Sequence, residues 1–150
     1  MTKACHIEEF HSIEDSVYTA LANAGAFDIL RQQERIILKP NLVNASPPPI
    51  TFPVQMADAL VTAIREQSDA EVIVAEGSGD RTLSTDEIFL QLGYRQIAVR
   101  HNVPLVDLNE EPLWRLENDG CSVFREMYLP EILFDLSLIH ISEPTRRNQS

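Results

Sequence analysis

Three short apolar runs without polar alternation constrain the fold of this chain more than any other feature. They cover residues 35–39, 71–76 and 103–108. Each run has the length of a strand, and a run that is apolar at successive positions is typical of a strand covered on both faces of a parallel sheet. We therefore expect three buried strands at these positions.

Segments with apolar residues at helical spacing lie around and between these runs. They cover residues 13–24, 51–64, 84–92 and 94–100, and the second is expected to open at Thr51 or Phe52. Ser12 suits the N-cap of the first helix, which Gly25 would end, and Pro53 suits the first turn of the second. Ser84 and Glu87 form a capping box that opens the third. Strands and helices that alternate in this way favour right-handed crossovers, so the sequence predicts an α/β fold: a three-layer sandwich with a mostly parallel sheet.

Two polar segments are expected to be loops, and one further strand is expected near the end. Residues 41–53 are rich in Asn, Ser and Pro, and residues 109–120 are polar without helical spacing. Residues 122–129 are expected to form another strand. The strongest loop prediction is the proline-rich one, because consecutive prolines favour a stiff extended backbone.

Composition excludes several classes of protein. The chain has 150 residues, of which 44% are hydrophobic, so one domain with a buried core is expected. Its net charge of -11 repels phosphate backbones and anionic lipid, which argues against nucleic acid and membrane partners. Cys5 and Cys121 are far apart and supply neither a disulfide framework nor a complete metal-ligand set. Without a signal peptide or a long apolar stretch, we expect a cytoplasmic protein.

The C-terminal tail, residues 136–150, does not fit the rest of the chain. Its residues 136–146 (LSLIHISEPTR) are identical to one translated frame of a transposase-adapter sequence used in short-read library preparation. We interpret residues 136–150 as a non-native tail and residues 1–135 as a truncated native domain. The other interpretation is a genuine short amphipathic strand over residues 136–141.

Polar residues follow each predicted strand, and the carboxyl ends of parallel strands are where α/β proteins bind ligands. The candidate ligand-binding residues are Lys39, Asn41, Glu76, Gly77, Ser78 and Asp107. We expect them to meet at one edge of the sheet, together with Asn44, Asp80 and Asn109. Lys39 with the backbone amides of residues 77–79 would suit a small anionic ligand. Glu76, Asp80 and Asp107 would alternatively suit a divalent metal.

Each of these signals also has an ordinary structural explanation. Gly77-Ser78-Gly79 lacks the spacing of dinucleotide- or phosphate-binding loops, so a tight turn is the default. Lys39 closes a buried strand and must either extend to solvent or find an acidic partner. No nucleophile elbow is present, so the catalytic residues, and whether the protein is an enzyme, are left open.

Four separated segments resemble the family called domain of unknown function 362. They are IILKPNLVN at 36–44, VIVAEGS at 72–78, FLQLGY at 89–94 and VDLN at 106–109. Within them the resemblance marks Lys39, Asn41 and Glu76. It also implies that the chain is the N-terminal part of a longer domain, and some members carry a cysteine-rich segment that binds 4Fe-4S clusters. This sequence lacks that segment, so a cluster is expected only in a full-length parent.

The expected function is therefore that of a small-anion- or metal-binding protein, as a fragment of a redox-linked, iron-sulfur-associated parent. In this interpretation Lys39 holds the anion, Asn41 orients it, and Glu76 or Asp107 serves as ligand or base. The alternative is a non-catalytic ligand-binding or interaction module. The oligomeric state is not predicted.

Overall fold

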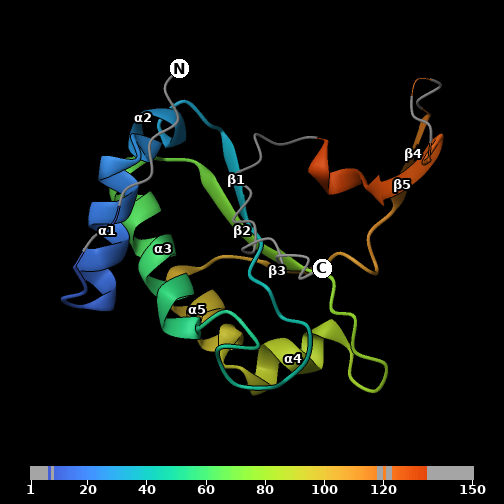
Figure 1. Cartoon of the computed structure of the whole chain (residues 1–150), viewed down its shortest axis with the longest axis horizontal. Helices are drawn as coiled ribbons and strands as arrows, with labels where there is room; N and C mark the ends of the chain where they lie inside the picture. The colour runs from blue at the N-terminus through green and yellow to red at the C-terminus, as the bar shows by residue number, and fades with distance from the viewer. Residues whose placement is uncertain (1–6, 8, 118–119, 121–122, 135–150) are drawn as a thin grey trace, which may run out of the picture.

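The computed structural model describes residues 7, 9–117, 120 and 123–134, and every structural statement below concerns these residues. Figure 1 shows the order of the elements along the chain. The helices are α1 (Ile13–Asn23), α2 (Ala26–Leu30), α3 (Val54–Gln67), α4 (Thr85–Gln91), α5 (Tyr94–His101) and the 3-10 helix η1 (Glu131–Leu133). The strands are β1 (Arg35–Leu38), β2 (Glu71–Glu76), β3 (Leu105–Asp107), β4 (Leu113–Glu117) and β5 (Glu126–Pro130).

The three expected buried strands form one parallel sheet in the order β1-β2-β3. Ile36 lies opposite Val72, and Ala75 lies opposite Val106. β3 is shorter than the predicted 103–108, because Pro104 has no N–H to donate and lies before the strand. The predicted α/β fold with a parallel sheet is confirmed.

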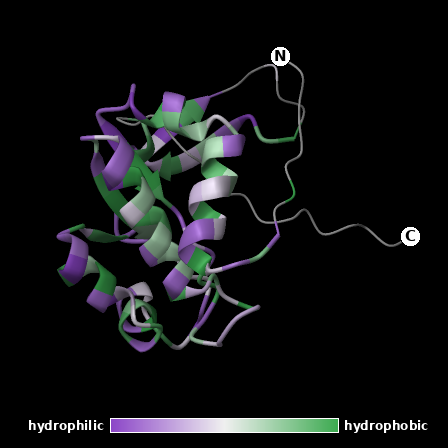
Figure 2. Cartoon of the chain, turned by 90° about the vertical axis from the view of Figure 1, so that its left-hand side faces the viewer, coloured by the Kyte–Doolittle hydropathy of each residue, from purple (hydrophilic) through white to green (hydrophobic). Residues whose placement is uncertain are grey.

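The five α-helices pack against one face of this sheet (Figure 1). Alternate strand residues, Ile36 and Leu38 of β1 with Val72 and Val74 of β2, enter the main core together with apolar residues of all five α-helices. In Figure 2 the strands are mostly hydrophobic, whereas the helices carry both hydrophilic and hydrophobic residues. This difference is expected, because a helix on a sheet buries only the stripe that faces the strands.

The intervening strand residues form a second, smaller cluster on the opposite face. It contains Ile37, Ile73, Ala75 and Leu108, which are all buried. Partly buried Val106 of β3 and Ile132 and Leu133 of η1 pack against it. The described residues thus supply one full helical layer and only a short helix on the second face, so the third layer of the sandwich stays a prediction.

The helix ends follow local sequence signals closely. The Ser12 side chain accepts a hydrogen bond from the Asp15 N–H, and the capping box of Ser84 and Glu87 is complete. Gly25 is a correction: it has φ 69° and serves as the N-cap of α2, while Ala24 caps the end of α1. The start of the second helix is another correction: α3 begins at Val54 and not at Thr51 or Phe52, and Pro53 is its N-cap, just before the first turn.

The prediction of a loop over residues 109–120 is wrong in its second half. β4 lies there and pairs antiparallel with β5, with Trp114 opposite Leu129. Apolar Trp114 and Leu116 alternate with charged Arg115 and Glu117, the two-residue period of a half-exposed strand. β5 confirms a strand near the expected 122–129. The hairpin extends away from the parallel sheet (Figure 1).

The predictions about the C-terminal tail and about Cys121 concern residues that the structure does not describe. Residues 135–150, which contain the segment interpreted as a non-native tail, lie outside the described residues, as does Cys121. Among the described residues, no helix has the length and apolar character needed to cross a membrane.

Candidate functional site

The structure joins Lys39 and Glu76 across the ends of two adjacent strands. Lys39 directly follows β1, and Glu76 is the last residue of β2. The Lys39 Nζ atom lies 2.9 Å from Oε1 and 3.1 Å from Oε2 of Glu76. Lys39 therefore has the acidic partner that a lysine at the end of a buried strand requires, and the pair is the centre of the strand-end site described below.

The two partners of this ion pair differ in exposure. The Glu76 side chain is 5% exposed, whereas the Lys39 side chain is 37% exposed. Glu76 also accepts hydrogen bonds from the N–H of Gly77 at 2.8 Å and of Leu42 at 3.4 Å. The ammonium and the two amides together compensate for the cost of removing a carboxylate from water. The exposed part of the pair is the lysine.

A buried tyrosine lies close to this carboxylate. Tyr94, the first residue of α5, is 0% exposed and donates from its hydroxyl to the carbonyl of Phe52 at 3.0 Å. Burial raises the pKa of the Tyr94 phenol, and the negative charge of Glu76 raises it further. Phe52 in turn donates from its N–H to the carbonyl of Asn41 at 2.8 Å. Tyr94 thus holds the far end of the 41–53 loop over the core.

A second polar network connects β3 to the turn after β2. The hydroxyl of Thr85 donates to Oδ1 of Asp107 at 2.8 Å and accepts from the N–H of Ser78 at 3.2 Å. The Asn109 side chain donates to the carbonyl of Ser78 at 3.0 Å, and the Asn109 N–H donates to Asp107. Asp107 therefore belongs to a network that fixes the turn, whereas the described hydrogen bonds of Lys39 go to Glu76.

The turn over residues 77–80 is packed tightly against this network. A Cβ atom at Gly77 would lie 2.8 Å from Oδ1 of Asn109, so only glycine fits there without movement. The Ser78 hydroxyl donates to the carbonyl of Val43 at 2.9 Å, which ties the turn to the 41–53 loop. Asp80 accepts from the N–H and hydroxyl of Thr82 and from the N–H of Leu83, and these bonds lower the pKa of Asp80.

The sequence left two kinds of ligand open, an anion or a metal, and the structure does not support them equally. No group of three acidic, histidine or cysteine side chains in the described part of the chain could hold a metal ion. Glu76, Asp80 and Asp107 therefore do not form the expected metal-ligand set, because each has its own separate hydrogen-bond partners. The cradle of backbone amides is also wrong at Gly77 and Ser78, whose N–H groups donate to Glu76 and Thr85. Lys39 remains as the candidate anion-binding group.

The asparagine side chains of the 41–53 loop make contacts within the loop. The Asn41 amide nitrogen lies 3.5 Å from the carbonyl of Ile50, and Asn44 Oδ1 accepts from the N–H of Ser46 at 2.8 Å. Asn41 is two positions after Lys39 in the sequence and lies at the base of the loop. Its place is consistent with the strand-end site.

Sequence reasoning missed Thr85 and Tyr94. Thr85 lies just inside a capping box, and Tyr94 directly follows a glycine that ends a helix. These local signals explain both residues without a role in a site, so neither was a candidate. Their hydroxyls become important only because the residues are buried, at 1% and 0% exposure. A buried hydroxyl requires a partner, and here the partners belong to the site.

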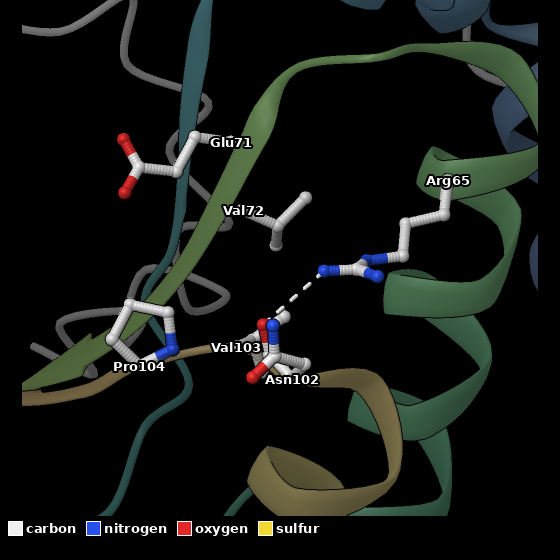
Figure 3. Close-up of a pocket in the computed structure, with 6 residues that line it drawn as sticks. All are labelled: Arg65, Glu71, Val72, Asn102, Val103 and Pro104. Carbon is white, nitrogen blue, oxygen red and sulfur yellow. Dashed lines mark hydrogen bonds between the residues drawn. The ribbon is translucent and has the colours of Figure 1, made fainter.

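Two surface hollows lie near the parallel sheet. The first, of about 500 Å³, is lined by Arg65, Glu71, Val72, Asn102, Val103 and Pro104. It lies at the amino ends of β2 and β3, opposite the strand-end site, and Figure 3 shows the Arg65 guanidinium directed to the Asn102 carbonyl. The second, of about 490 Å³, is lined by Ser84, Asp86, Leu105, Val106, Asp107, Glu110 and Glu111.

Comparison with family models gives one match. A model described as "Domain of unknown function (DUF362)" matches residues 36–143, which is more than half of the chain. The matched range contains Lys39, Glu76 and Asp107, and it ends within the segment 136–150 that was interpreted as a non-native tail. No curated protein and no solved structure matches the chain.

Proposed function

We propose that this chain, which belongs to the DUF362 family of domains of unknown function, binds a small anionic ligand at the strand-end site through Lys39. A single observation carries the proposal. The ion pair joins a carboxylate that is almost fully buried to an ammonium that is one-third exposed. Such pairs contribute little net stability compared with apolar residues of similar size, so their presence at a strand end suits a binding role.

The roles of the side chains follow from their exposure. An ammonium group has three donors, and the described hydrogen bonds of Lys39 go to the two oxygens of one carboxylate. Lys39 can therefore also donate to a ligand from the solvent side. Glu76 positions Lys39 and is the candidate proton acceptor, since it lies directly beside the ligand-binding ammonium. Asn41 would orient the ligand from the loop that follows Lys39. Gly77, Ser78 and Asp107 shape the turn that borders the site.

Calorimetry with inorganic phosphate and with succinate tests this proposal. Lys39→Gln removes the charge and keeps a polar side chain that is one atom shorter. Arg35→Gln is a matched control, because it removes one charge at the opposite end of the same strand. We expect saturable binding that weakens about tenfold in Lys39→Gln, as for the loss of one charge-assisted hydrogen bond, and stays unchanged in Arg35→Gln. Equal affinity in both variants, or no saturable binding to the native chain, would overturn the proposal.

A second candidate function is a non-catalytic interaction module, and the hairpin favours it. Trp114 and Leu116 of β4 share one face with Met127 and Leu129 of β5, since opposite residues of an antiparallel pair lie on the same side. Trp114 is 54% exposed and Met127 is 44% exposed. An apolar face of this kind on a two-stranded sheet favours contact with another surface. If Lys39→Gln loses phosphate binding while the hairpin still binds its partner surface, the two functions are separate.

We also propose a longer, cytoplasmic parent protein in which residues 1–135 are the N-terminal part of the domain. The family resemblance supports a redox-linked parent whose 4Fe-4S cluster would be held by residues outside this chain. Sequencing of the locus from independent template tests this. A continuous native frame through residues 136–146 would contradict the interpretation of the tail, and a downstream cysteine cluster would support the redox parent.

A further inference from the structure

β3 is the edge strand of the described sheet, and its outer side carries unpaired main-chain groups. The Val74 N–H donates to the Pro104 carbonyl at 3.0 Å, and the Leu108 N–H donates to the Glu76 carbonyl at 2.9 Å. A parallel ladder uses alternate residues of a strand, so Leu105 turns its N–H and carbonyl away from β2, and so does the N–H of Asp107. None of the described residues pairs with these three groups.

A groove runs along this open edge. The β3 groove is the second hollow described above, lined by Ser84, Asp86, Leu105, Val106, Asp107, Glu110 and Glu111. Leu105 and Val106 contribute its apolar part, and both are partly exposed. The start of α4 and the segment 110–111 form its two sides. A strand that entered the groove would therefore find both main-chain partners and an apolar surface.

The charge of the groove is strongly one-sided. Its lining includes the carboxylates of Asp86, Asp107, Glu110 and Glu111 and no basic side chain. Asp86 has a distant ion pair with Arg95, at 3.6 Å. A second copy of this chain would bring a net charge of -11 to the same place and would be repelled. The acidic lining of the groove is therefore complementary to a partner that carries positive charge.

We propose that the β3 groove binds an extended, lysine- or arginine-containing segment of another protein, which adds to the sheet as a strand beside β3. Main-chain hydrogen bonds to Leu105 and Asp107 would give affinity, as in other cases of strand addition. Side chains alternate along an extended strand, so basic residues at every second position can lie on the α4 side of the sheet with Asp86 and Asp107. The other residues then lie on the opposite face, with Val106.

A fluorescent hexapeptide of alternating lysine and valine, with blocked ends, tests this proposal by anisotropy on the full chain. A glutamate–valine hexapeptide is the control for charge. Two further lysine–valine peptides carry N-methyl groups on alternate amides, one in each register. N-methylation removes the main-chain donors of one edge and keeps the charge, so it separates strand addition from simple attraction.

Protein variants locate the bound peptide. Glu110→Gln combined with Glu111→Gln removes two charges from the groove. Glu66→Gln combined with Asp69→Asn is the matched control, since both residues are exposed and lie around the end of α3. Hydrogen exchange of the Leu105 and Asp107 amides provides a readout that net charge alone does not change.

The expected results are specific. The lysine–valine peptide binds, N-methylation in one register weakens binding about tenfold through the loss of two or more hydrogen bonds, and the glutamate–valine peptide does not bind. The Glu110→Gln and Glu111→Gln pair weakens binding several-fold at low salt, the control pair does not, and the Leu105 amide becomes protected. Equal binding of both N-methylated peptides and the parent, an equal effect of the two variant pairs, or no binding would overturn the proposal.

Discussion

Removal of Lys39 should destabilise the protein more than removal of the charge on its partner. In Lys39→Met the Glu76 carboxylate keeps the amides of Leu42 and Gly77 but loses its ammonium while 5% exposed. Breaking a buried pair in this way costs about 3 kcal/mol. In Glu76→Gln the lysine is left without its partner, but it is 37% exposed and can turn to water, so we expect a loss of about 1 kcal/mol.

Urea unfolding followed by circular dichroism measures this asymmetry at low protein concentration. With a slope of about 2 kcal/mol/M, the midpoint should fall by about 1.5 M in Lys39→Met and by about 0.5 M in Glu76→Gln. The double variant Lys39→Met with Glu76→Leu removes both charges and should recover most of the loss. Equal losses in the two single variants, or a larger loss in Glu76→Gln, would refute the assignment of Glu76 as the buried partner.

Three other predictions concern the surroundings of the site and the hairpin. Because the pKa of Tyr94 is raised, its contribution to the free energy of unfolding is complete below the ordinary value of 10.0 and falls as pH rises above it, since the tyrosine of the unfolded chain ionises first. Tyr94→Phe should lower the free energy of unfolding by about 1 kcal/mol at neutral pH. The variant should then lose less stability than the native chain on going to alkaline pH, as urea midpoints on both sides of that value would show. Gly77→Ala should cost about 1 to 2 kcal/mol through the contact with Asn109, and Asn109→Ala in the same chain should relieve the overlap; unfolding that shows no such relief counts against the tight turn. The full chain should associate in light scattering, because Trp114, Met127 and Phe134 are exposed, and Trp114→Thr should reduce this, whereas a sharp two-state melt of a soluble monomer would contradict it.

The sequence predicted the parallel sheet well, because its signals are local. Continuous apolar runs specify buried strands, and capping residues such as Ser12 and Ser84 specify where helices begin. β4 was missed because Arg115 and Glu117 make its segment polar on average. Its strand state depends on pairing with β5, and Arg115 then lies beside Glu117 and Glu126.

The sequence predicted the contact between Lys39 and Glu76 but not the partners of the surrounding groups, and the binding role of the site stays a prediction. The rule that ligands collect at strand ends is a property of topology, and it correctly brought Lys39 and Glu76 together. It could not show that Glu76 accepts a hydrogen bond from the Gly77 N–H, so that this N–H is not available to bind an anion. Nor could it find Thr85 and Tyr94, since the burial of a hydroxyl is decided by how distant helices pack.

NMR of the full chain with 13C at the lysine Cε position tests the central claim most directly, because the sequence has lysine only at positions 3 and 39. On titration with inorganic phosphate, we predict that the Lys39 signal moves with a saturable curve and that the Lys3 signal does not follow it. The same curve should appear in Arg35→Gln. A Lys39 signal that stays still, or that moves linearly together with that of Lys3, would contradict a binding role for the exposed ammonium.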